Sequence, residues 1–166
     1  VLFRSHTIQT GMVLTTANVS ANLSTITGGE LRGPAGGELV LSQFNTSGQL
    51  TISSNIVNHT SATALTKAGP GTVELTGTNS YTGTTLVGGG VLRASDGVGL
   101  PTASSLVLDG GVFQSTTASF SRALGSAAGQ VSLPGGISGF SAASTPLTVN
   151  LGGSAATLQW GTAHFA

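Results

Sequence analysis

Glycine pairs punctuate this 166-residue chain, and they constrain its fold more than any other feature. They occur at six places: 28–29, 36–37, 88–90, 110–111, 135–136 and 152–153. Glycine adopts positive φ at no steric cost, which suits a tight bend, whereas inside a helix each glycine costs roughly 1 kcal/mol. The pairs therefore predict frequent turns between short extended segments.

The segments around the glycine pairs repeat one another. Three of them align without gaps: TITGGELRG (25–33), TLVGGGVLRAS (85–95) and LVLDGGVFQST (106–116). Two columns of this alignment are apolar: Ile26, Val87 and Leu108 in one, and Leu31, Leu92 and Phe113 in the other. The last two copies are 21 residues apart, which is the length of one coil of a solenoid.

Apolar and polar residues alternate between the glycine pairs. Three short stretches show it best: Leu39 with Leu41, Leu50 with Ile52, and Val73 with Leu75. A period of two predicts strands with one buried face. Residues 118–125 also fit a helix, but their neighbours favour a strand. Asn45 and Asn79 are expected in turns, where asparagine tolerates the same backbone conformation as glycine.

A stack of coils explains this pattern better than a sandwich or a closed barrel, which also use short strands. The repeat is short, and its small apolar residues suit a narrow core. One coil could not fold alone, because each buried Val or Leu contributes only about 1.5–3 kcal/mol against the entropy of ordering a glycine-rich chain. We predict one all-β domain over residues 1–166, a parallel β-helix (β-solenoid) of about seven to eight rungs.

Residues 65–95 (LTKAGPGTVELTGTNSYTGTTLVGGGVLRAS) resemble the passenger-associated transport repeat, also called the autotransporter-associated β-strand repeat. The matching positions are Lys67, Gly69, Gly71, Thr72, Val73, Leu75, Gly77, Asn79, Tyr81, Gly83, Thr85, Val87, Gly89, Gly90 and Leu92, with Val73 where leucine is usual. This single copy covers under a fifth of the chain. The resemblance implies a right-handed β-solenoid on a secreted or cell-surface protein of Gram-negative-type bacteria, and no single activity.

The composition of the chain argues against several classes of binding partner. Only 6% of the residues are charged and the formal net charge is zero, so no electrostatic field favours nucleic acid or anionic membranes. The chain has no cysteine, which excludes disulfides and thiolate metal sites. No apolar run approaches the ~20 residues of a membrane helix. Near-zero charge also removes the repulsion that keeps copies of a protein apart.

Catalytic and metal-binding patterns are missing from the sequence. Eight residues could carry such chemistry: Glu30, Glu38, Glu74, Asp96, Asp109, His6, His59 and His164. Only Glu30 and Glu38 are close enough in sequence to suggest a pair, and both follow glycine pairs as solvated turn residues would. The KAGPGT stretch (67–72) lacks the ending of a phosphate loop. We expect that the protein is not an enzyme and that it binds no cofactor or metal.

Two functions remain. The first is a structural extracellular solenoid that assembles head to tail with itself, as scaffold or filament subunit. Its expected interface is formed by apolar residues near the two ends, Leu2, Phe3, Trp160 and Phe165, although residues 1–5 resemble a translated adapter sequence and need not be native. The alternative is an adhesin or glycan-binding segment of a larger surface protein. Short threonine ranks at 75–78 and 82–86 hint at a binding face, whereas Tyr81 is expected to pack over its own turn.

Overall fold

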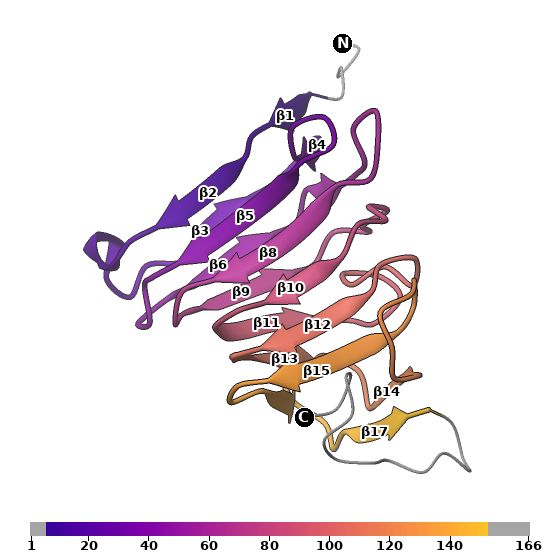
Figure 1. The fold of residues 1–166 in the computed structure, drawn as a ribbon. Coiled ribbons are helices and arrows are strands. Elements are labelled where there is room, and N and C mark those ends of the chain that lie inside the picture. The colour runs from indigo at the N-terminus through magenta and orange to yellow at the C-terminus, as the bar shows by residue number, and fades with distance from the viewer. Residues whose placement is uncertain (1–5, 153–166) are drawn as a thin grey trace.

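The computed structural model describes residues 6–152, and these form a parallel β-solenoid (Figure 1). The first sheet contains β2 (Met12–Thr15), β5 (Glu38–Gln43), β8 (Ala64–Ala68), β10 (Thr85–Val87), β12 (Leu106–Asp109) and β15 (Val131–Gly135). The second contains β3 (Ser24–Ile26), β6 (Gln49–Ile52), β9 (Thr72–Leu75), β11 (Gly90–Ala94), β13 (Gly111–Ser115) and β16 (Gly139–Ala142). Each chain turn adds one strand to each sheet, and all strand pairs are parallel.

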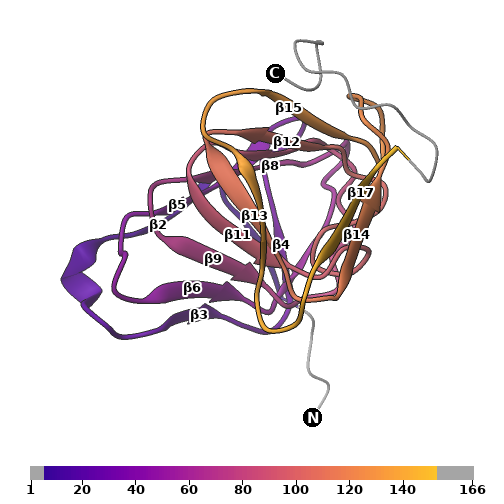
Figure 2. The same ribbon diagram turned by 90° about the horizontal axis from the view of Figure 1, so that it is seen from below.

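A third side closes the coil. It holds β1 (Thr7–Gln9), β4 (Glu30–Arg32) and β7 (Asn55–Ile56) at one end, and β14 (Ser119–Arg122) and β17 (Thr148–Leu151) at the other. Viewed along the axis, the strands lie on three sides around a central core (Figure 2). A 3-10 helix, η1 (Ala17–Val19), projects from the first coil. The predicted fold is confirmed, with about six coils in residues 6–152 against the seven to eight expected.

The core is a set of side-chain columns that run along the axis. One column on the second sheet stacks Leu50, Val73, Leu92, Phe113 and Phe140 in register. The predicted inward residues are confirmed, because Val73, Leu75, Val87, Leu92, Leu108 and Phe113 are all at most 2% exposed. Stacked columns bury each apolar side chain against the coil above and the coil below, so the coils stabilise one another.

Three aromatic side chains pack against one another in the core of the later coils. Phe120 packs between Phe113 and Phe140, with ring centroids 5.3 and 4.8 Å away. Phe120 lies on β14, so residues 118–125 contain a strand and the expectation of extended structure there is confirmed. Residues 6–152 contain no helix long and apolar enough to cross a bilayer.

One alignment made from the sequence is wrong. Val87 does pair with Leu108, and Leu92 with Phe113, as expected. Ile26, however, lies on the second sheet beside Ile52, and Leu31 lies on the third side beside Ile56, so the copy at 25–33 is displaced by one side of the solenoid. The strand–glycine–strand pattern marks a corner, but more than one corner of the coil uses it.

Asn45 and Asn79 do lie in connections between strands, but the backbone reason for expecting them there is wrong. Within residues 6–152 the only non-glycine residue with positive φ is Ser20, at 53°. The two asparagines act through their side chains instead. Asn79 Oδ1 accepts from the Ile56 amide, and Asn79 Nδ2 donates to the Gly99 carbonyl, both at 2.7 Å. Asn45 Nδ2 donates to the Ser20 carbonyl at 2.6 Å. These amides replace backbone bonds between coils where the ladder is interrupted.

Candidate binding face

The outward face of the second sheet carries a rank of polar side chains. Thr51, Glu74, Arg93, Gln114 and Ser141 follow one another in register on β6, β9, β11, β13 and β16. They alternate with the inward column of Leu50, Val73 and Leu92, because successive residues of a strand point to opposite faces. We call this rank, together with Gln49, the polar ladder.

Hydrogen bonds hold the polar ladder in place. Gln49 Nε2 donates to Glu74 Oε2 at 2.7 Å and to Thr51 Oγ1 at 3.2 Å. Arg93 Nε donates to Gln114 Oε1 at 2.5 Å, and Arg93 Nη1 reaches Gln49 Oε1 at 3.3 Å. Arg93 and Glu74 are register neighbours, but they are not among the ion pairs that residues 6–152 form. The side chains of the polar ladder therefore hold one another in place, and its two charges balance.

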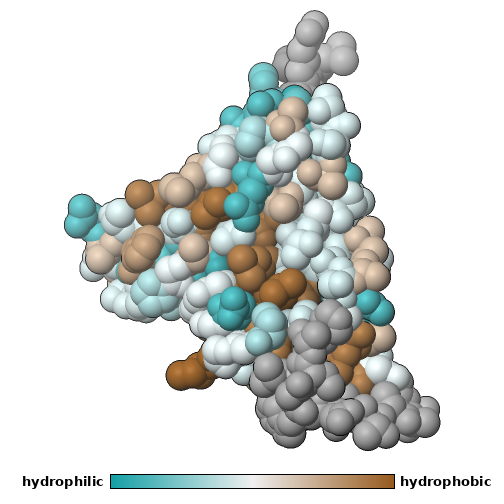
Figure 3. All heavy atoms as spheres, in the orientation of Figure 1, coloured by the Kyte–Doolittle hydropathy of each residue, from teal (hydrophilic) through white to brown (hydrophobic). Residues whose placement is uncertain are grey.

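The first sheet presents a different outward surface. The outward side chains that follow one another in register on this sheet are Met12, Val40, Thr66, Leu86 and Val107. Four of these five side chains are apolar, and Met12 is 53% exposed. Figure 3, in the orientation of Figure 1, shows apolar side chains scattered among polar and weakly polar ones on the visible face. Polar side chains in register are thus more frequent on the outward face of the second sheet than on that of the first.

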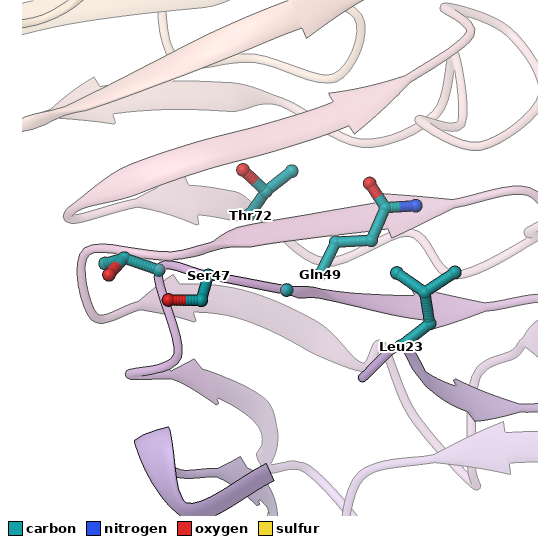
Figure 4. Close-up of a pocket in the computed structure, with 6 residues that line it drawn as sticks. Leu23, Ser47, Gln49 and Thr72 are labelled. Carbon is teal, nitrogen blue, oxygen red and sulfur yellow. The ribbon is translucent and has the colours of Figure 1, made fainter. Parts of the chain in front are cut away.

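A pocket of about 270 Å³ opens at the corner between the two sheets (Figure 4). Its lining residues are Leu23, Thr46, Ser47, Gly48, Gln49 and Thr72. The corner connection is long in the first coils, at residues 16–23 and 44–48, shortens through 69–71 and 88–89 to Gly110 alone, and comprises residues 136–138 in the last coil. The corner therefore widens toward the early coils, and the pocket lies in the widened part, next to the start of the polar ladder.

Lys67 lies inside the solenoid, in the column between Leu41 and Val87. The side chain is fully buried, and Nζ donates to the carbonyls of Ala68 at 3.0 Å, Gly69 at 2.7 Å and Gly89 at 2.9 Å. Burial lowers the pKa of Lys67 to about 8. Because Gly89 belongs to the next coil, the ammonium links two coils at a corner. The KAGPGT stretch (67–72) therefore stabilises a corner of the solenoid.

A second buried cation joins the later coils. Arg122 donates to Asp96 Oδ1 from Nε at 3.0 Å and from Nη2 at 2.6 Å. It also donates to the carbonyls of Ser104 and Pro101, at 2.5 and 2.9 Å. The sequence carried no signal for this pair, because its members are 26 residues apart. All of these contacts tie β14 to the connection between β11 and β12, one coil earlier.

The candidate catalytic residues do not converge. Glu30 begins β4 on the third side and accepts from Thr7, while Glu38 begins β5 on the first sheet and accepts from Thr66. Each carboxylate therefore bridges to a neighbouring coil. Within residues 6–152 no three His, Asp or Glu side chains lie close enough to hold a metal.

Two other sequence expectations concern aromatic residues. Tyr81 lies inside the core, 0% exposed, and its hydroxyl is 2.8 Å from the Oγ1 atom of Thr85, four residues further along the chain. Burial raises the pKa of this hydroxyl. The expected interface residues Leu2, Phe3, Trp160 and Phe165, and His164, lie outside the described residues.

Comparison with known proteins agrees with the resemblance seen in the sequence. The family model described as passenger-associated-transport-repeat matches residues 65–94. The adhesin BmaC autotransporter of Brucella suis biovar 1 (strain 1330) is 35% identical over 116 residues, which are 64% of this chain and 3% of that protein. No solved structure matches. Residues 65–94, which run from β8 to β11, therefore match the passenger-associated transport repeat, and the chain is similar to a short segment of an autotransporter.

Proposed function

We propose that this chain is a ligand-binding segment of an adhesin-like passenger on a bacterial surface, and that the polar ladder is its contact face. The ordered row of donors and acceptors from Gln49 to Gln114 is the observation that carries the proposal. The similarity to a protein named an adhesin supports it. The chain spans 3% of that protein's length, so the proposal concerns this segment alone.

The geometry favours binding over chemistry. Strands of a sheet lie about 4.8 Å apart, so the ladder offers one hydrogen-bonding side chain per coil at that spacing. Such a row suits an extended ligand that makes many weak contacts. The side chains already bond to one another, which reduces the entropy lost when a ligand orders them. We propose that the segment binds and releases its ligand unchanged, without catalysis, metal or cofactor.

Adhesion of coated beads tests this function. Beads carrying the purified chain would be applied to monolayers of cultured animal cells, and the number retained after washing would be counted. A ladder variant, Gln49→Ala with Arg93→Ala and Gln114→Ala, should retain less than half as many beads as the wild type. A control variant, Thr102→Ala with Ser121→Ala, changes exposed polar residues away from the ladder and should retain the full number. Equal retention by all three proteins would contradict the proposal.

Head-to-tail self-association is a second candidate. Within residues 6–152, β1, β2 and β3 are each the end strand of their sheets, and Ile8 on β1 is 52% exposed although its register partner Leu31 is buried. Unpaired strand edges and exposed core residues are surfaces that a second copy could cover. Sedimentation across a hundredfold concentration range tests whether the chain self-associates. A growing assembly that Phe165→Lys shortens would support it, and a monomer at every concentration would contradict it.

A further inference from the structure

The corner pocket spans three successive coils. Leu23 comes from the first, residues 46–49 from the second, and Thr72 from the third. Gln49 and Thr72 are register partners on β6 and β9, so the floor of the pocket belongs to the second sheet. Figure 4 shows Leu23, Ser47, Gln49 and Thr72 around the opening. Three successive coils thus contribute residues to one hollow.

The lining is uncharged and rich in free hydroxyl groups. No acidic or basic side chain lines the pocket. The hydroxyls of Thr46, Ser47 and Thr72 make no hydrogen bond to any residue in the range 6–152. The Gln49 amide, in contrast, is fixed by Glu74 and Arg93. The pocket therefore combines one oriented amide with three hydroxyls that remain available to a ligand.

Apolar surface borders these polar groups. Leu23 is an apolar lining residue and is 69% exposed. Binding sites for small molecules commonly pair apolar or aromatic surface with a few oriented polar groups. A sugar ring has the matching character, with hydroxyls around its edge and C–H groups on its faces. The pocket volume of about 270 Å³ is below the ~300–1,000 Å³ typical of drug-sized ligands, so one ring is the fitting unit.

We propose that the corner pocket binds one uncharged sugar unit of a glycan whose chain continues along the polar ladder. This inference rests on the proposed binding function and specifies its ligand class. Thr46, Ser47 and Thr72 bond to ring hydroxyls, the Gln49 amide orients the ring, and Leu23 contacts its C–H groups. An acidic sugar fits less well, because Arg93 does not line the pocket and already bonds to Gln49 and Gln114.

A peptide ligand is disfavoured by the sheet itself. Extended peptides bind to sheets by adding a strand to a free edge. The strands β6 and β9, which carry Gln49 and Thr72, are each paired on both sides. Their backbone groups are therefore already used, and only side chains remain for recognition at this place.

Nuclear magnetic resonance with simple glycosides tests the proposal. The labelled chain would be titrated through the millimolar range with methyl glucoside, methyl galactoside, methyl mannoside and, as the charged comparison, N-acetylneuraminic acid. We expect saturable shifts of the Gly48, Gln49 and Thr72 amide signals with at least one neutral glycoside. Thr72→Val should weaken that binding about fivefold, as expected for one lost neutral hydrogen bond, and the exposed-site control Thr102→Val should leave it unchanged.

Three results would overturn the inference. They are no saturable shift with any neutral glycoside, binding that both Thr72→Val and Ser47→Ala leave intact, and binding of the acidic sugar alone. The bead assay separates this inference from the proposed function. Beads that adhere through the ladder while no glycoside binds would remove the sugar pocket and leave the adhesive face. Glycoside binding by a chain whose beads do not adhere would remove the adhesive face and leave the sugar pocket.

Discussion

Raising the pH should stabilise this protein, because Lys67 is buried as a cation. Its pKa is lowered from 10.5 to about 8, and desolvation is the cause. In the unfolded chain the pKa returns to the ordinary value near 10.4. Between these two values the unfolded state binds more protons than the folded state, so the free energy of unfolding increases with pH. The destabilising contribution is fully present below about pH 8 and is relieved as the pH rises toward about 10.5.

The size of the effect follows from the same two pKa values. Between about pH 7.5 and about pH 9.5, a fully desolvated ammonium would contribute roughly 2 kcal/mol to the free energy of unfolding. Gly69 and Gly89, whose carbonyls accept from Lys67, are only half-buried, so solvent screening reduces that figure. We expect an increase of about 1 kcal/mol.

Guanidinium chloride unfolding, followed by far-ultraviolet circular dichroism at several pH values, measures this increase. Lys67 is the only lysine in the chain and Tyr81 the only tyrosine, so few other groups titrate in the range. The raised pKa of Tyr81 adds stability that is lost only above about pH 10, outside the window. The control is Lys67→Met, which keeps the length of the side chain and should show no increase. A wild type whose stability stays level or falls relative to Lys67→Met would refute the reasoning.

Three further changes test the solenoid by the same unfolding measurement. Leu92→Asp should lower the free energy of unfolding by at least about 4 kcal/mol, because it places a carboxylate in the core, whereas Val91→Asp on the outward side of the same strand should cost under about 1 kcal/mol. Gly90→Ala should cost at least about 2 kcal/mol, since φ is +63° and a Cβ would lie 2.5 Å from a carbonyl oxygen. Gly88→Ala, with no atom closer than 3.9 Å, should stay within about 0.5 kcal/mol of the wild type. Asn79→Ala should cost about 2–4 kcal/mol, because two buried backbone groups lose their partners.

The candidate site was less predictable than the fold. Gln49 and Glu74 are 25 residues apart, Arg93 and Gln114 are 21 apart, and Arg93 and Gln49 are 44 apart. No single period aligns these residues in the sequence, because successive coils differ in length. The pocket was equally hidden, since it arises from corner connections that lengthen toward the early coils. Residues that lie in the most regular copy of the repeat, such as Lys67 and Tyr81, proved to be structural.

The sequence by itself determined the strands, the corners and the inward side chains. Alternation decides which face of a strand is buried, and a glycine at positive φ decides where the chain can bend, and both properties are local. Only the tertiary structure decided which corner each glycine pair occupies, as Ile26 and Leu31 show by lying one side away from their aligned positions. It also decided that Lys67 lies in the core and which outward side chains meet. The physical reason is that contacts between coils depend on the number of residues in every turn, and that number varies along the chain.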